Sequence, residues 1–120
     1  MSTPAHRPAG IHLLADLHGV DPALLSDPGQ IDALLRRAAL AAQASILHSH
    51  FHAFGPGMGV TGVLLLAESH ISIHTWPEAS FAAADIFMCG AAQPRRALEV
   101  IEAALRPASC AVQTIARGQL

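Results

Sequence analysis

Three histidines at alternate positions form the first group of side chains in this sequence that could bind a metal ion or take part in a reaction. His48, His50 and His52 would share one face of an extended strand, because strand side chains point alternately to opposite faces. Three such imidazoles can bind a zinc ion. No Cys, Asp or Glu flanks this histidine row, and a polar row on a partly solvated strand or at a dimer contact explains it more simply. A non-enzymatic metal-binding domain therefore stays open as an alternative.

Residues suited to nucleophilic and acid–base chemistry lie further along the chain. Ser69, His70, His74 and Asp85 supply the residue types of a hydrolase triad, but no serine occurs in a G-x-S-x-G sequence. Cys89 stands at the end of a predicted strand, before a glycine, where a thiol can be exposed and reactive. A buried, inert thiol is the alternative interpretation of this cysteine.

Length and composition limit the class of protein. The 120 residues suffice for one domain, 1–120. Hydrophobic residues make up 52% and charged residues 13%, so the chain can bury enough apolar surface to fold. The net charge of -2, without a basic tract, argues against a nucleic-acid partner. No apolar run approaches the roughly 18 residues of a membrane span, and the first residues lack a secretion signal. We therefore expect a cytoplasmic protein without a membrane or nucleic-acid partner.

The absence of lysine restricts the cofactor chemistry. All seven basic residues are Arg, so the chain cannot hold pyridoxal phosphate through an internal lysine Schiff base. The two cysteines, Cys89 and Cys110, fit no metal or CxxC spacing and are expected to be free thiols. The low charge content also indicates a thinly charged surface, of the kind that dimerisation often covers.

Hydrophobic periodicity and turn residues predict the elements that must position these side chains. Strands are expected at 10–17, 45–54, 60–67, 69–76, 81–89 and 110–116, and helices are expected to open at Pro28 and Pro94. In the second strand, Ile46 and Phe54 should share the face of the histidine row. The third strand is apolar throughout and should be buried on both faces. The order β-α-β-β-β-β-α-β predicts an α+β sandwich, with helices on one face of a largely antiparallel sheet.

Several sequence motifs together resemble a known enzyme family. ESHISIHTWPE at 68–78, followed by AAADIFMCG at 82–90, resembles the processing and active-site region of bacterial and archaeal S-adenosylmethionine decarboxylases. Further stretches of the family resemble GIHLLADL at 10–17, FHAF at 51–54 and GVTG at 59–62. The resemblance covers roughly residues 10–117. These small enzymes of polyamine synthesis are proenzymes that cut their own chain to make a pyruvoyl cofactor.

The resemblance implies how that covalent pyruvoyl group would form. Ser69 is its precursor, and the Ser69 hydroxyl would attack the carbonyl of Glu68. His74 would then accept the α-proton of Ser69, and the chain would divide into residues 1–68 and 69–120. The pyruvoyl carbonyl can form a Schiff base with the substrate's own amine, so a chain without lysine still gains the electron sink that a decarboxylase needs.

The resemblance also assigns the remaining site residues. Cys89 matches the donor that protonates the substrate carbon after CO₂ leaves, and Thr61 stands where a serine usually supports processing. Phe54 and Trp76 would stack on the adenine of S-adenosylmethionine, while Glu78 would bind the ribose hydroxyls. The family assembles as a homodimer of cleaved protomers, and its product is the aminopropyl donor of spermidine biosynthesis.

Two departures from the family pattern keep a second substrate class open. The glycine-rich loop at 55–59 is one residue longer than usual, and Met88 stands where Thr is common. An altered loop beside Phe54 would reshape the adenine end of the pocket. A pyruvoyl-dependent ornithine or arginine decarboxylase on the same fold therefore remains the alternative enzyme.

Overall fold

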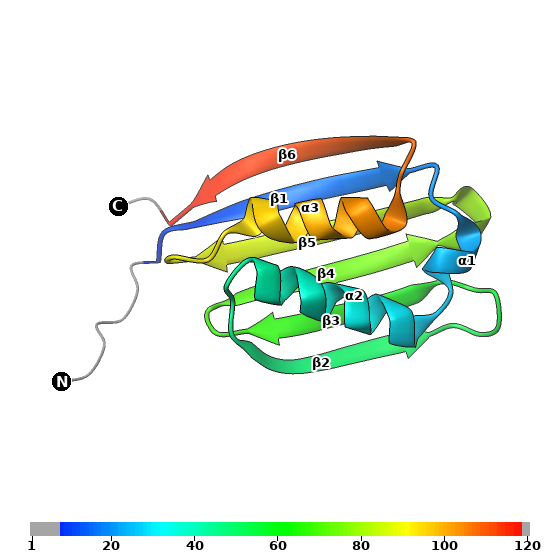
Figure 1. Cartoon of the computed structure of the whole chain (residues 1–120), viewed down its shortest axis with the longest axis horizontal. Helices are drawn as coiled ribbons and strands as arrows, with labels where there is room; N and C mark the ends of the chain where they lie inside the picture. Colours follow the sequence, from blue (N-terminus) through cyan, green and yellow to red (C-terminus); the bar gives the residue numbers. More distant parts are fainter. Residues whose placement is uncertain (1–7, 119–120) are drawn as a thin grey trace.

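The computed structural model describes residues 8–118, which form one antiparallel sheet with its helices on one face (Figure 1). The elements are β1 (Gly10–His18), α1 (Pro22–Leu25), α2 (Pro28–Ala41), β2 (Ile46–Ala53), β3 (Val60–Leu66), β4 (Ser69–Trp76), a 3-10 turn (Pro77–Ala79), β5 (Phe81–Cys89), α3 (Pro94–Leu105) and β6 (Ser109–Arg117). The spatial order of the strands is β2-β3-β4-β5-β1-β6. The α+β class and the predicted element order are confirmed, and α1 is an additional single-turn helix.

Local sequence explains where the long helices begin and which side they bury. The Asp27 carboxylate caps α2 by accepting hydrogen bonds from the N–H groups of Gly29 and Gln30, at 3.0 and 3.2 Å. The buried stripe of α2 consists of Ile31, Leu34, Leu35, Ala38 and Ala39, and that of α3 consists of Ala97, Leu98, Ile101 and Leu105. No helix within residues 8–118 is long and apolar enough to cross a membrane. The expected cytoplasmic location stays a prediction.

The sheet therefore has two unlike faces. The covered face, which lies under α2 and α3, carries fully buried side chains from the central strands, including Leu13, Leu64, Ile71, Ile73 and Ile86. On the open face, opposite the helices, the strand register aligns His12, His70, His74, Trp76, Phe81 and Phe87. Leu65 also lies there, paired with His70, and is 45% exposed. The expectation that β3 is buried on both faces is wrong for the single chain, because both long helices pack on the same side.

A bulge in the edge strand β2 changes the predicted alternation. Ile46 pairs with Leu66 and His48 pairs with Leu65, so one extra residue is accommodated between Ile46 and His48. Ile46 therefore packs against the core, and the prediction that it shares a face with the histidine row is wrong. Phe54 follows the end of the strand, and its ring contacts that of His52 at a centroid distance of 4.7 Å.

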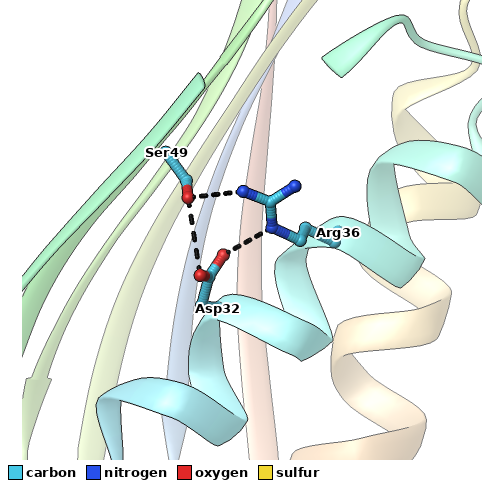
Figure 2. Close-up of polar contacts among 3 residues, drawn as sticks. All are labelled: Asp32, Arg36 and Ser49. Carbon is cyan, nitrogen blue, oxygen red and sulfur yellow. Dashed lines mark hydrogen bonds and ion pairs between the residues drawn. The ribbon is translucent and has the colours of Figure 1, made fainter. Parts of the chain in front are cut away.

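A polar cluster holds this edge strand to α2 (Figure 2). Arg36 Nη2 donates to Ser49 Oγ at 2.7 Å, and Arg36 Nε donates to Asp32 Oδ1 at 3.0 Å. Ser49 Oγ in turn donates to Asp32 Oδ2 at 3.4 Å. Exposed ion pairs of this kind are worth about 1 kcal/mol or less. The cluster orients strand β2. Because Ser49 points towards α2, His48 and His50 on either side of it point to the open face.

We expect Gly62→Ala to lower the free energy of unfolding by about 1–3 kcal/mol, the usual cost of overpacking. Gly62 lies opposite Phe51, and a Cβ at this position would overlap the Phe51 ring. Urea unfolding would measure the change. The control is Gly29→Ala in the first turn of α2, where a Cβ would meet only Asp27 Oδ1, at 3.4 Å. This control should be neutral or slightly stabilising. Equal stability of the two variants would contradict the packing of Phe51 over Gly62.

Candidate active site

The residues predicted to do chemistry fall into two groups at opposite ends of β4. Ser69 is the first residue of that strand, and His74 lies five residues further on. Five residues of extended chain span about 16 Å at roughly 3.3 Å per residue, and an odd separation points the two side chains to opposite faces. Ser69 and His74 of one chain therefore cannot touch. A hydrolase triad containing both of them is not assembled in this structure.

The Ser69 end is built on a tight hairpin between β3 and β4. Leu66 pairs with Ser69, which leaves Ala67 and Glu68 as the two turn residues. Glu68 has a φ of 60°, a left-handed conformation that costs a non-glycine residue on the order of 1–3 kcal/mol. The hydroxyl oxygen of Ser69 accepts a hydrogen bond from the backbone N–H of Cys89 at 3.2 Å. The Glu68–Ser69 peptide bond thus lies beside the end of β5, in a strained turn.

Cys89 completes this end of the sheet. It pairs with Gly10, where a Cβ would lie only 2.9 Å from Cys89 Sγ, so the glycine leaves room for the sulfur. The thiol is free and partly buried. Its burial, and secondarily the carboxylate of Glu68, raise the pKa of the Cys89 thiol above its ordinary value. The proton therefore stays on Sγ through neutral pH, as a general acid requires.

The His74 end begins with a side-chain pair on adjacent strands. Thr61 of β3 lies directly opposite His74 of β4, and Thr61 Oγ1 and His74 Nδ1 form a hydrogen bond of 3.0 Å. His74 is exposed on the open face. The threonine thus keeps a hydroxyl in contact with the imidazole. A hydroxyl bonded to one ring nitrogen fixes the orientation of the ring, which suits a residue that must accept a proton.

A cavity of about 300 Å³ opens beside this pair. Its lining consists of Phe54, Met58, Gly59, Thr61, His74, Thr75, Trp76 and Glu78. The three residues predicted to bind substrate come from a loop, a strand end and a 3-10 turn, and they meet around this one hollow. The ring of Phe81 stacks on Trp76 at a centroid distance of 5.4 Å, which holds the indole in place.

Thr75 fixes the floor of the cavity from the covered face. It is buried, with 5% of its surface exposed, and its hydroxyl oxygen accepts a hydrogen bond from the N–H of Val60 at 2.8 Å. The same hydroxyl donates to the carbonyl oxygen of Leu25 at 2.7 Å. Thr75 thereby joins the end of β4 to the start of β3 and the end of α1. This role was not predicted from the sequence, although a polar residue in phase with Ile71 and Ile73 implied a buried hydroxyl that needs partners.

The histidines at the centre of the open face form a separate group. The rings of His12 and His70 lie 6.2 Å apart, and both contact Phe87. Burial and the neighbouring His12 lower the pKa of His70, while Asp85 acts in the opposite direction. No cluster of His, Cys, Asp or Glu within residues 8–118 has the geometry to hold a metal ion. The structure therefore gives the metal-binding alternative no support.

Comparison with known proteins decides the family. The family model described as S-adenosylmethionine decarboxylase matches residues 11–118. The chain belongs to the S-adenosylmethionine decarboxylase family. A proenzyme of this family from Sulfurihydrogenibium sp. (strain YO3AOP1) is 50% identical over 99 residues, which cover 82% of this chain and 74% of that protein. The proenzyme from Pyrococcus furiosus is 38% identical over 110 residues, 91% of this chain and 78% of that protein.

A solved structure supports the same assignment. The adenosylmethionine decarboxylase from Aquifex aeolicus VF5 superposes with a TM-score of 0.85 at 41% identity, and the match covers 92% of each chain. The resemblance derived from the sequence motifs is therefore confirmed, and this member of the S-adenosylmethionine decarboxylase family is a decarboxylase. The amino-acid decarboxylase and metal-binding alternatives are not favoured.

We expect alkylation of Cys89 by iodoacetamide to show a midpoint at higher pH than an ordinary thiol, because its pKa is raised and only the thiolate reacts. The uncut chain is best obtained as Ser69→Ala, with Cys110→Ala to remove the second thiol. Adding Glu68→Gln removes the carboxylate that opposes thiolate formation. The midpoint should then move to lower pH. An unchanged or higher midpoint would contradict the electrostatic contribution of Glu68.

Proposed function

We propose that the protein is a self-processing, pyruvoyl-dependent decarboxylase of S-adenosylmethionine whose active site is completed by a second copy of the chain. The observation that carries the proposal is the division of the site along β4. Ser69 and Cys89 lie at one end, while His74 and Thr61 lie beside the cavity at the other. Each chain thus holds both halves of a site, but the extended strand β4 keeps the two halves too far apart to act together.

Chain cleavage would begin at the hairpin. Ser69 Oγ attacks the carbonyl carbon of Glu68, the peptide C–N bond breaks, and an ester joins the two residues. Loss of the Ser69 α-proton then breaks the bond between Cβ and Oγ of residue 69. The main-chain carboxylate of Glu68 leaves as the new C-terminus, which gives the two chains 1–68 and 69–120. Hydrolysis of the new N-terminus releases ammonia and leaves the pyruvoyl group. The left-handed conformation of Glu68 and the Cys89 N–H on Ser69 Oγ both support this site of cleavage.

The base that takes the α-proton has to come from the partner chain. In a dimer whose two-fold axis runs across the strands, a face contacts its own copy in reversed direction, so one end of the face meets the other end of the partner's face. The open face suits such a contact, because Leu65, Trp76 and Ile115 are between 41 and 45% exposed on it. Two stacked open faces would give two sites. Each would bring the end of the sheet that carries Ser69 and Cys89 of one protomer to His74 and the cavity of the other. Cys89 lies in phase with Phe87 on the open face, and the partner's His74 would act on the α-carbon of Ser69, not on the Ser69 hydroxyl.

The described residues fit a pyruvoyl group at position 69. No lysine is available to hold pyridoxal phosphate, and Ser69 lies in a strained turn with its hydroxyl already bonded to backbone. When formed, the group supplies a carbonyl that accepts the electrons left as CO₂ departs. Cys89 carries out the proton step. Its Sγ keeps a proton at neutral pH, and the backbone N–H of Cys89 bonds to Ser69 Oγ. Both observations support the assignment of Cys89 as the donor to the substrate carbon.

The cavity favours an adenosyl substrate over a linear amino acid. Stacking of a base on an aromatic ring contributes about 1–3 kcal/mol per base in nucleic-acid systems, and the cavity offers Phe54 and Trp76. Glu78, on the same wall, can accept hydrogen bonds from ribose hydroxyls. An ornithine or arginine substrate would use only the carboxylate and gain little from the rings. Decarboxylated S-adenosylmethionine would then serve as the aminopropyl donor of spermidine synthesis.

We expect inactive variants to complement each other in cleavage. Ser69→Ala and His74→Ala should each stay uncut when produced alone. Produced together with distinguishable tags, the His74→Ala chain should be cut, because its Ser69 faces His74 of the Ser69→Ala chain. Denaturing mass spectrometry should find fragment 69–120 with pyruvoyl in place of serine. Cleavage of His74→Ala by itself would contradict a shared site.

The control for this experiment pairs His74→Ala with the double variant Ser69→Ala, His74→Ala. Neither chain then supplies the imidazole, so both should remain uncut. If the complementing pair also stays uncut, while mixed wild-type chains with the same tags are processed, the proposal that the partner supplies the base is wrong.

We expect the fully cut enzyme to release CO₂ from S-adenosylmethionine with a much higher kcat/KM than from ornithine or arginine. Phe54→Ala should raise the KM for S-adenosylmethionine by about 5- to 150-fold, the equivalent of one lost base–aromatic stack. Its effect on either amino acid should be small. Leu47→Ala, which removes an exposed side chain outside the cavity, is the control. Preference for an amino acid would overturn the adenosyl assignment and leave the processing reaction intact.

A further inference from the structure

The loop between β2 and β3 presents one large side chain to the cavity. It runs Phe54-Gly55-Pro56-Gly57-Met58-Gly59, so Met58 is the only long side chain after Phe54. The N–H of Phe54 donates to the carbonyl of Gly59 at 3.0 Å, and the N–H of Met58 donates to the carbonyl of Gly55 at 3.0 Å. Gly55 and Gly57 have φ angles of 134° and 71°, which other residues rarely adopt. The loop thus turns back sharply and returns Met58 towards its own start.

The Met58 side chain lies across that start. A Cβ at Gly55 would be 3.2 Å from Met58 Sδ, so the thioether lies over the glycine that follows Phe54. Met58 is 53% exposed and lines the cavity together with Phe54, Trp76 and Glu78. An exposed, flexible apolar side chain at the rim of a partly aromatic cavity has contact surface to gain from a bound ring.

The far end of the loop is held against the buried Thr75. Gly59 lies directly on the carbonyl oxygen of Thr75, where a Cβ would overlap that oxygen. Thr75 is itself fixed by its hydrogen bonds to Val60 and Leu25. Both ends of the loop are therefore anchored to the cavity wall, and the position of Met58 at the rim follows from backbone contacts.

We infer that Met58 is a further substrate-binding residue, whose thioether packs on the adenosyl group held between Phe54 and Trp76 and adds to selectivity for it. This inference rests on the proposed function. The physical basis is the favourable contact between a polarizable sulfur and an aromatic ring. A linear amino acid offers no ring to this side chain, so Met58 would discriminate between the two substrate classes.

A direct test uses the three methionines as reporters. Protein labelled with ¹³C at the methionine methyl groups is titrated with 5′-methylthioadenosine, which carries the adenosyl group but neither the amine nor the carboxylate. Met58→Leu identifies the Met58 signal, and Met88, which is 2% exposed on the covered face, serves as the internal reference. We expect nuclear Overhauser contacts between the Met58 methyl and adenine protons, and none from Met88.

Kinetics of the cut enzyme provide the second readout. Met58→Ala should raise the KM for S-adenosylmethionine by about 2- to 12-fold, the range for one lost sulfur–aromatic contact, with kcat nearly unchanged and cleavage intact. Met58→Leu, which keeps the apolar bulk but removes the sulfur, should raise the KM by less than Met58→Ala does. Leu40→Ala, which removes a side chain that is 65% exposed on α2, should leave KM unchanged.

The outcomes separate this inference from the proposed function. Trp76 is the only tryptophan, so its fluorescence reports occupancy of the cavity. If methylthioadenosine changes that fluorescence while Met58 shows no contact and Met58→Ala keeps its KM, the inference about Met58 is wrong and the proposed function stands. Loss of chain cleavage in Met58→Ala would also overturn it, in favour of a structural role. If the ligand leaves Trp76 unchanged and S-adenosylmethionine is not decarboxylated, the proposed function itself fails.

Discussion

A straight β-strand cannot bring its first and sixth residues together, and the site of this protein depends on that constraint. Ser69 and His74 both belong to β4, and paired strands on either side keep β4 extended. Ser69, at the proposed cleavage site, and His74 are thus held apart. In the proposed dimer, each chain would carry two incomplete sites. The open face between them, with its aromatic rings and exposed Leu65, is free of the two long helices.

The cavity depends on the alternation of side chains along β4 between the two faces of the sheet. His74 and Trp76 point to the open face, while Thr75 between them points to the covered face and is bonded to Val60 and Leu25. A buried hydroxyl with both a donor and an acceptor partner is costly to disturb, because removing it would leave buried backbone groups unpaired. The end of β4 that carries His74 and Trp76 is therefore held in place by Thr75 on the covered face. The glycine-rich loop packs against the carbonyl oxygen of Thr75 through Gly59.

Much of the fold follows from local sequence. The strand and helix positions are set by hydrophobic periodicity and by turn residues, since these depend on the backbone preferences of neighbouring residues. Pro28 and Pro94 predicted the starts of α2 and α3, and both helices begin at these residues. The long motif at 68–78 indicated the family, which the comparisons confirm. The motif at 68–78 also indicated Ser69 and His74 as chemical residues, and the stretch at 82–90 indicated Cys89; these assignments stay predictions.

Other features depend on contacts between residues far apart in sequence, so only the tertiary structure decides them. The bulge that moves Ile46 into the core arises from pairing with β3, and the exposure of Leu65 follows from both helices packing on one face. Phe54, Trp76 and Glu78 surround one cavity because separate segments converge there, and Met58 joins them through a loop fixed on Thr75. The sequence by itself determined the elements and the reactive residue types; the sheet register decided which of those residues meet, because pairing between strands, and not spacing along the chain, sets distance in space.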